Sequence, residues 1–213
     1  MAPAGRGGIS YARCVVVSLH PVPAEFTVAT ESIRALEYRS DLQVQEIRPP
    51  EGLAPHSYAL SADVATDGTT NAGQLGTGRF ILLHDEQEPD AWRGAFRVVC
   101  FAQAPLETDI GSDGMLPEVA WSWLVDALDA SAADYRYSSG TVTVVNSQGF
   151  GEIAEQGEGS QIEMRASWTP QDLDLGGHVE AWTTLLCMLA GLPPVDSNEV
   201  PVLRHAGQAH GLR

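Results

Sequence analysis

The 213-residue chain contains no lysine, so its 12 basic residues are all arginine, and 28 acidic residues give it a formal net charge of -16. A field of this sign repels phosphate backbones, which argues against direct binding to nucleic acid. No run approaches the roughly 18 to 20 apolar residues that a membrane-spanning helix needs, so we expect no membrane association. The remaining composition is that of a soluble globular protein.

Cysteine is also scarce. Cys14, Cys100 and Cys187 are odd in number and far apart, which argues against a disulfide framework and excludes the usual C-x-x-C pairing of zinc sites. We therefore expect a cytoplasmic protein whose thiols are small buried apolar groups. No stretch carries a catalytic or ligand-binding signature, so neither a metal nor a cofactor is expected, and an enzyme is not the favoured interpretation.

The most informative stretch is a pair of apolar runs at 80–83 and 95–101, which flank an acidic loop at 85–90. Both runs are rich in β-branched or aromatic residues and have the length of strands. Glycine and proline bound them on both sides. The pattern predicts a long hairpin at the centre of a sheet.

Periodicity predicts the remaining elements. Apolar residues recur at helical spacing within 25–38, 116–131 and 177–191. Further strands are expected at 42–45, 58–64, 135–137, 141–145 and 162–168. Residues 66–78 lack periodicity and are expected to form a mobile surface loop.

This order of elements predicts an α+β fold, a mainly antiparallel sheet of about six strands with three helices packed on it. We expect a flexible leader at 1–24, a single domain at 25–193 and a disordered tail at 194–213.

Four polar residues form a candidate small-ligand or catalytic site near the 66–78 loop: Asp63, Arg79, His84 and Arg97. Asp63 lies in an otherwise apolar strand, so an inward carboxylate needs a partner such as Arg79 or Arg97. A structural ion pair is the favoured explanation of this pattern, and a site requires the pair to line a cleft. His84 begins a run of three polar side chains that is most simply a solvated loop.

The five tryptophans suggest a different kind of function, association with another protein. Trp121, Trp168 and Trp182 lie on faces that we expect in the core, and His178 is expected as a polar residue at a helix end. Trp123 lies on a second apolar stripe of its helix, together with Val119 and Ala130, and this stripe is either a second core layer or an interface. The leading hypothesis is a non-catalytic protein–protein interaction or adaptor module that forms a homodimer through this stripe.

Several segments between residues 26 and 194 share a recognisable pattern: 53–55 with 59–64, 78–85, 92 with 96–99, 116–118 with 121–124, 139–143, 165–170 and 178–182. This pattern resembles an actinobacterial family known as domain of unknown function 3000. The resemblance implies a bacterial cytoplasmic setting and brings no known activity or catalytic residue. Genes of this family often neighbour one for a ribonuclease D-like exonuclease, so the resemblance also implies a third alternative, an accessory to RNA metabolism.

Overall fold

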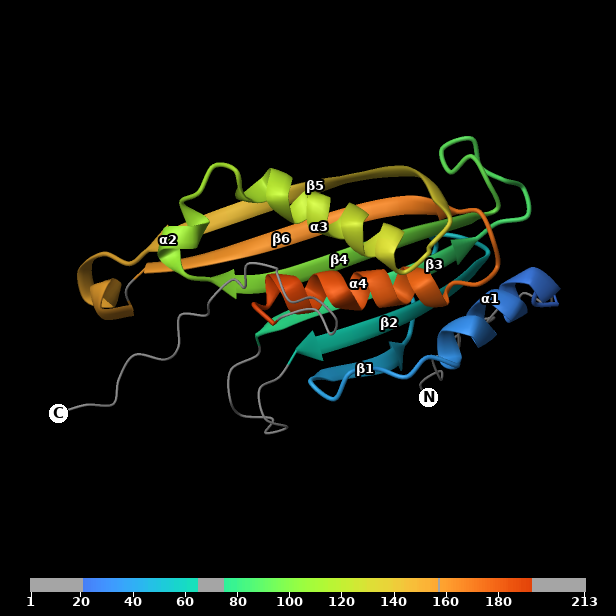
Figure 1. The fold of residues 1–213 in the computed structure, drawn as a ribbon, viewed down its shortest axis with the longest axis horizontal. Coiled ribbons are helices and arrows are strands. Elements are labelled where there is room, and N and C mark those ends of the chain that lie inside the picture. The colour runs from blue at the N-terminus through green and yellow to red at the C-terminus, as the bar shows by residue number, and fades with distance from the viewer. Residues whose placement is uncertain (1–20, 65–74, 157, 193–213) are drawn as a thin grey trace, which may run out of the picture.

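The computed structural model describes residues 21–64, 75–156 and 158–192. This part of the chain forms one six-stranded antiparallel sheet with helices packed on it, which confirms the predicted α+β fold (Figure 1). The strands are β1 (Leu42–Ile47), β2 (His56–Val64), β3 (Gly76–His84), β4 (Phe96–Leu106), β5 (Tyr135–Gln148) and β6 (Glu158–Pro170). Most of the predicted leader, all of the predicted tail and Cys14 lie outside the described residues.

The predicted hairpin is confirmed as the centre of the sheet. The strand order is β1-β2-β3-β4-β6-β5, so β3 and β4 are the two middle strands. The predicted end of the 66–78 loop is wrong, because residues 76–78 already belong to β3. Glycine has no side chain to contribute to a period-2 pattern, so the start of this strand was not recognised. Residues 66–74 of the predicted loop lie outside the described residues.

Two long helices cover one face of the sheet. The helices are α1 (Ala24–Arg34), α2 (Thr108–Gly111), α3 (Leu116–Ala130) and α4 (Gly176–Leu189), with a 3-10 turn η1 at Gly151–Gln156. α4 packs on β2, β3 and β4, and α3 packs on β5 and on α4 (Figure 1). The three predicted helices are confirmed, and the short α2 within the acidic connector was not predicted.

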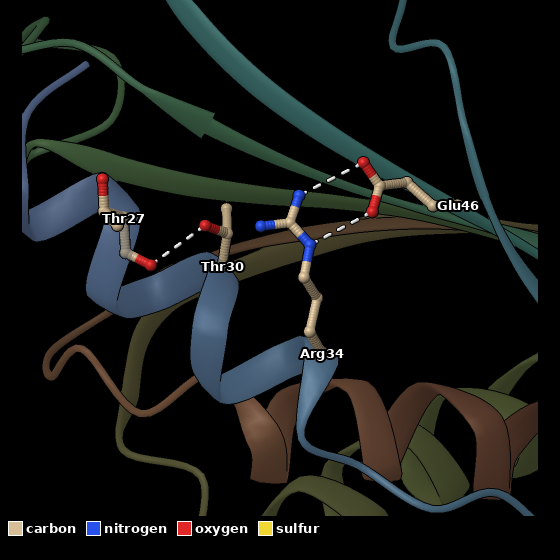
Figure 2. Close-up of polar contacts among 4 residues, drawn as sticks. All are labelled: Thr27, Thr30, Arg34 and Glu46. Atoms are coloured by element: carbon tan, nitrogen blue, oxygen red, sulfur yellow. Dashed lines mark hydrogen bonds and ion pairs between the residues drawn. The ribbon is translucent and has the colours of Figure 1, made fainter. Parts of the chain in front are cut away.

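α1 is attached to the sheet mainly by its apolar side. Phe26, Ala29 and Ile33 are buried at helical spacing. On its outer side, Arg34 donates from Nε and Nη2 to the two carboxylate oxygens of Glu46 in β1, at 3.2 Å each (Figure 2). Both partners of this ion pair are about half exposed, so it contributes little to stability and the buried side chains decide the position of α1.

Trp168 and Trp182 are fully buried, as predicted, and each donates its indole N–H to a specific acceptor. Trp182 Nε1 donates to the Phe101 carbonyl at 3.1 Å, and Trp168 Nε1 donates to His178 Nδ1 at 3.0 Å. His178 lies at the start of α4, as expected, but it is buried in the core and not a polar residue of the surface. The imidazole stacks on the Trp168 ring of β6 and is enclosed in the core.

β5 is one long strand with an irregularity, where two strands were predicted. Its pairing with β6 shifts register between Arg136 and Ser139, and Tyr137 has a positive φ of 55°. Such a bulge interrupts the two-residue alternation, which is why the sequence pattern breaks there. The shift places Ser139 directly opposite Ser167 of β6.

Candidate functional site

The candidate site is the face of the sheet opposite α3 and α4, which we call the open face. Side chains alternate across a strand, so if Phe80 and Leu82 of β3 point to the helices, Arg79 and Ile81 point away from them. The same alternation in β4 places Val99 and Phe101 on the open face, half-buried in contrast to their fully covered neighbours. No helix of the described part of the chain packs on this face.

Two hollows lie side by side in the open face. The central hollow, of about 460 Å³, is lined by Thr77, Arg79, Ile81, Val99, Cys100, Phe101, Gln103 and Arg165. The serine hollow, of about 420 Å³, is lined by Val99, Ser139, Gly140, Thr141, Arg165, Ala166 and Ser167. Val99 and Arg165 belong to both, so the two hollows form one continuous surface with an apolar floor and polar walls.

The charge of the central hollow is opposite to that of the chain as a whole. Arg79 is exposed and makes no ion pair with any described residue. Arg165 lies with its guanidinium carbon 5.8 Å from the centre of the Phe101 ring and is paired with Glu163 at 2.7 Å. A locally cationic, partly apolar surface on a chain of net charge -16 favours acidic ligands.

Arg97 is buried beside the serine hollow, and its partners among the described residues are all neutral. Its Nη1 donates to the Tyr137 carbonyl at 3.1 Å and to Thr169 Oγ1 at 2.9 Å. Its Nη2 donates to Ser139 Oγ at 3.3 Å and to Ser167 Oγ at 2.6 Å. Burial lowers the pKa of Arg97, but a guanidinium stays protonated, so an uncompensated positive charge lies at this end of the open face.

The four residues of the predicted small-ligand site are not all brought together. Asp63, Arg79 and Arg97 lie on the open face, whereas His84 lies on the helix side. Arg97 takes hydroxyl and carbonyl acceptors in place of the expected carboxylate of Asp63. Most of the 66–78 loop that was to complete this site lies outside the described residues.

His84 is buried, and the expectation of a solvated loop there is wrong. β3 extends to this residue, and its even-numbered position points to the helix side, where the ring is 1% exposed. The ring lies between Phe26, His56 and Phe96, with its centre 4.5 Å from that of Phe96. Neither ring nitrogen has a partner among the described residues, and burial lowers the pKa of His84.

We expect His84→Phe to leave the free energy of unfolding unchanged or to raise it by about 1 kcal/mol, because a phenyl ring needs no hydrogen-bond partner. Thermal and urea unfolding of the two proteins would measure this. His84→Asn, which retains polar atoms and loses ring contacts, is the control and should be less stable than wild type. A marked loss of stability in His84→Phe would show that the imidazole nitrogens have partners.

The predicted interface stripe is divided by the fold. Trp123 is only 9% exposed and belongs to the core between α3 and its neighbours, while Val119 is 37% exposed and Ala130 is exposed. The aromatic ring that motivated the stripe is therefore a core residue. Val119 and Ala130 alone remain available on the surface of α3.

Sequence reasoning missed the residues that line the hollows, above all Ser139 and Ser167. A signal was present: residues 161–167 of β6 alternate between polar and apolar, and Arg165 and Ser167 lie on the polar side. What connects them to Ser139 is the bulge in β5, which local sequence does not specify.

Other kinds of site have less support in the described residues. No group of three or more His, Cys, Asp or Glu side chains is placed there to hold a metal ion. Within 21–64, 75–156 and 158–192, no helix is long and apolar enough to cross a membrane. Cys100 and Cys187 are buried free thiols, as expected, and burial raises their pKa values to about 12 and about 11.

Comparison with known proteins identifies the family of the chain but does not indicate an activity. No curated protein and no solved structure is detectably similar to the chain. One family model, described as "Protein of unknown function (DUF3000)", matches residues 22–200, which include every described helix and strand. The predicted resemblance is thus confirmed, and the chain belongs to the DUF3000 family.

Proposed function

We propose that this protein is a non-catalytic binding module that associates with a protein partner through the open face of its sheet. The observation that carries the proposal is the cationic and apolar lining of the central hollow, with Arg79 and Arg165 around Ile81, Val99 and Phe101. Exposed apolar surface flanked by arginine is typical of binding surfaces. The site thereby moves from α3, where the sequence suggested it, to the opposite side of the molecule.

The partner we propose is a segment in which carboxylates flank an apolar side chain. Its carboxylates would pair with Arg79 and with the Nη groups of Arg165, which pairs with Glu163 through Nε, and its apolar side chain would cover Val99 and Phe101. The overall negative charge of the chain does not prevent this, because salt screens charges beyond about 8 Å at physiological ionic strength. A homodimer through the same face would bring two arginine-bearing surfaces together, so a different, acidic partner fits better.

The burial of the cysteine and histidine side chains in the described core favours a binding function over a catalytic one. Cys100 and Cys187 are enclosed and have raised pKa values, which keeps them protonated and unreactive. His84 and His178 are also enclosed in the core, away from the open face. The free thiols fit the reducing cytoplasm, which we propose as the compartment.

A defined peptide tests this proposal. We expect a fluorescein-labelled peptide of alternating glutamate and isoleucine or phenylalanine to raise fluorescence anisotropy saturably with the wild-type protein. Combining Arg79→Glu with Arg165→Glu should weaken this binding at least about tenfold, because it reverses both charges of the hollow.

Two controls separate a local effect from a general one. Combining Arg34→Glu with Arg48→Glu makes the same change in net charge outside both hollows and should leave binding within about twofold of wild type, given screening. A peptide with lysine in place of glutamate should not bind. Equal losses in the two double variants would contradict the open face as the site, and self-association in sedimentation would indicate a homodimer instead.

A further inference from the structure

The serine hollow has a feature that general charge complementarity does not explain. Arg97, 8% exposed, directs four N–H groups at neutral oxygen atoms and has no carboxylate partner among the described residues. Burying a charge is costly unless an opposite charge or strong hydrogen bonds compensate it. The protein therefore holds a buried positive charge in contact with two side chains that line the serine hollow, Ser139 and Ser167.

The hydroxyl groups that accept hydrogen bonds from Arg97 differ in whether their own hydrogens already have an acceptor. Thr169 Oγ1 accepts from Arg97 and donates to the Trp92 carbonyl at 2.5 Å, so its hydrogen is used. Ser139 Oγ and Ser167 Oγ also accept from Arg97, and the only further contact between them is long, at 3.4 Å. Such a contact uses at most one of the two serine hydrogens, so at least one is available.

These serine hydrogens are available on the side of the hollow. Ser139 is exposed, Ser167 is half-buried, and both line the serine hollow, whereas Arg97 is buried and is not part of the lining. A hydroxyl whose oxygen accepts from a cation is polarised, and its hydrogen must point away from that cation. Arg165, two residues from Ser167 on β6, adds an exposed guanidinium to the lining of the same hollow.

We propose that the serine hollow is a carboxylate site. Ser139 and Ser167 donate hydrogen bonds to the two oxygens of the anion, and the positive charge of Arg97 polarises both hydroxyl groups. Val99 supplies apolar surface for the group that carries the carboxylate. A carboxylate fits better than a phosphate dianion, because the charge of Arg165 is partly offset by its pair with Glu163 and the one remaining full positive charge, that of Arg97, matches a single negative charge. The source of the carboxylate, an acidic side chain of the partner, rests on the proposed function.

Three small aromatic probes test the site without any protein partner. In amide NMR titrations of the full chain, benzoate is expected to shift the signals of Gly140, Thr141 and Ser167 saturably. Benzamide has the same shape without the charge and should leave these signals unchanged, and phenyl phosphate should bind more weakly than benzoate. Benzamide shifts equal to those of benzoate would overturn the proposal, and tighter binding of phenyl phosphate would overturn the assignment to a carboxylate.

Variants then assign the donors. Ser139→Ala alters one exposed side chain, so the fold should persist, and it should weaken benzoate binding about tenfold, the usual effect of losing a hydrogen bond to a charged group. Combining Ser139→Ala with Ser167→Ala should abolish binding. Thr143→Ala, on the same strand but outside both hollows, is the matched control and should bind as wild type.

Unchanged affinity in Ser139→Ala would overturn the role of the serines. Failure of the acidic peptide with retained benzoate binding would remove the protein partner and leave the carboxylate site. Peptide binding without benzoate binding would do the reverse, so the two proposals fail separately.

Discussion

Acidification from pH 7.5 to 5.0 is expected to lower the free energy of unfolding by about 2 kcal/mol through His178 alone. Its ring is fully buried between α4 and β6, and burial lowers its pKa to about 4 despite the carboxylates of Asp134 and Asp174 nearby. Because the indole N–H of Trp168 can only donate, Nδ1 must be the acceptor, and the neutral ring carries its proton on Nε2.

The direction of the effect follows because burial in the folded state disfavours the protonated form of His178. An unfolded chain binds a proton on this histidine near pH 6.5, whereas the folded protein does so only near pH 4. The stabilisation is therefore complete above pH 6.5 and is lost progressively as the pH falls toward 4. A tenfold difference in proton affinity is worth about 1.4 kcal/mol, which gives about 2 kcal/mol at pH 5.0.

Urea unfolding of wild type and His178→Asn at several pH values would isolate this contribution. Asparagine keeps an oxygen that can accept from Trp168 but does not titrate, so the variant should be less stable at pH 7.5 and should lose less stability on acidification. Other titrating groups are common to both proteins and cancel in the difference. The series stops at pH 5.0 because the isoelectric point near 4.5 favours association. Parallel pH profiles would contradict the prediction.

The elements of the sheet were largely predictable because their signals are local. The β3 and β4 runs are apolar, short and bounded by glycine and proline, and they form the central hairpin as expected. The predictions failed where a residue's environment depends on a distant segment. His178 was judged by its position at a helix start, and only its contact with Trp168, ten residues away on β6, shows that it is buried.

The candidate site was less predictable than the fold for the same reason. Arg97 was identified as a possible partner of Asp63, but the hydroxyl groups that it contacts, those of Ser139 and Ser167, are 42 and 70 residues away from it in the sequence. Their meeting depends on the pairing of β6 with both β4 and β5 and on the bulge after Arg136. A single sequence shows that β6 has a polar side, but it does not show which strands lie beside it.

Gly78→Ala is expected to lower the free energy of unfolding by about 3 kcal/mol, a large effect for the addition of one methyl group. A Cβ atom at this position would lie 2.9 Å from Cζ2 and 3.1 Å from Nε1 of Trp182, and 3.0 Å from the Phe101 carbonyl oxygen. The indole cannot move away without breaking its bond to that carbonyl, which would leave a buried donor without an acceptor. The close approach of α4 to β3 thus depends on this glycine.

Urea unfolding of Gly78→Ala and of Gly159→Ala, in β6 with no atom within 4 Å of the added Cβ, would separate the clash from the general effect of removing a strand glycine. The control should be neutral or slightly stabilised, because alanine loses less backbone entropy on folding. A double-mutant cycle with Trp182→Phe, which removes the clashing indole atoms, should show a cost at least about 1 kcal/mol below the sum of the single changes. Additive costs would mean that the strain at Gly78 comes from the backbone and not from the indole, and that α4 is positioned by other contacts.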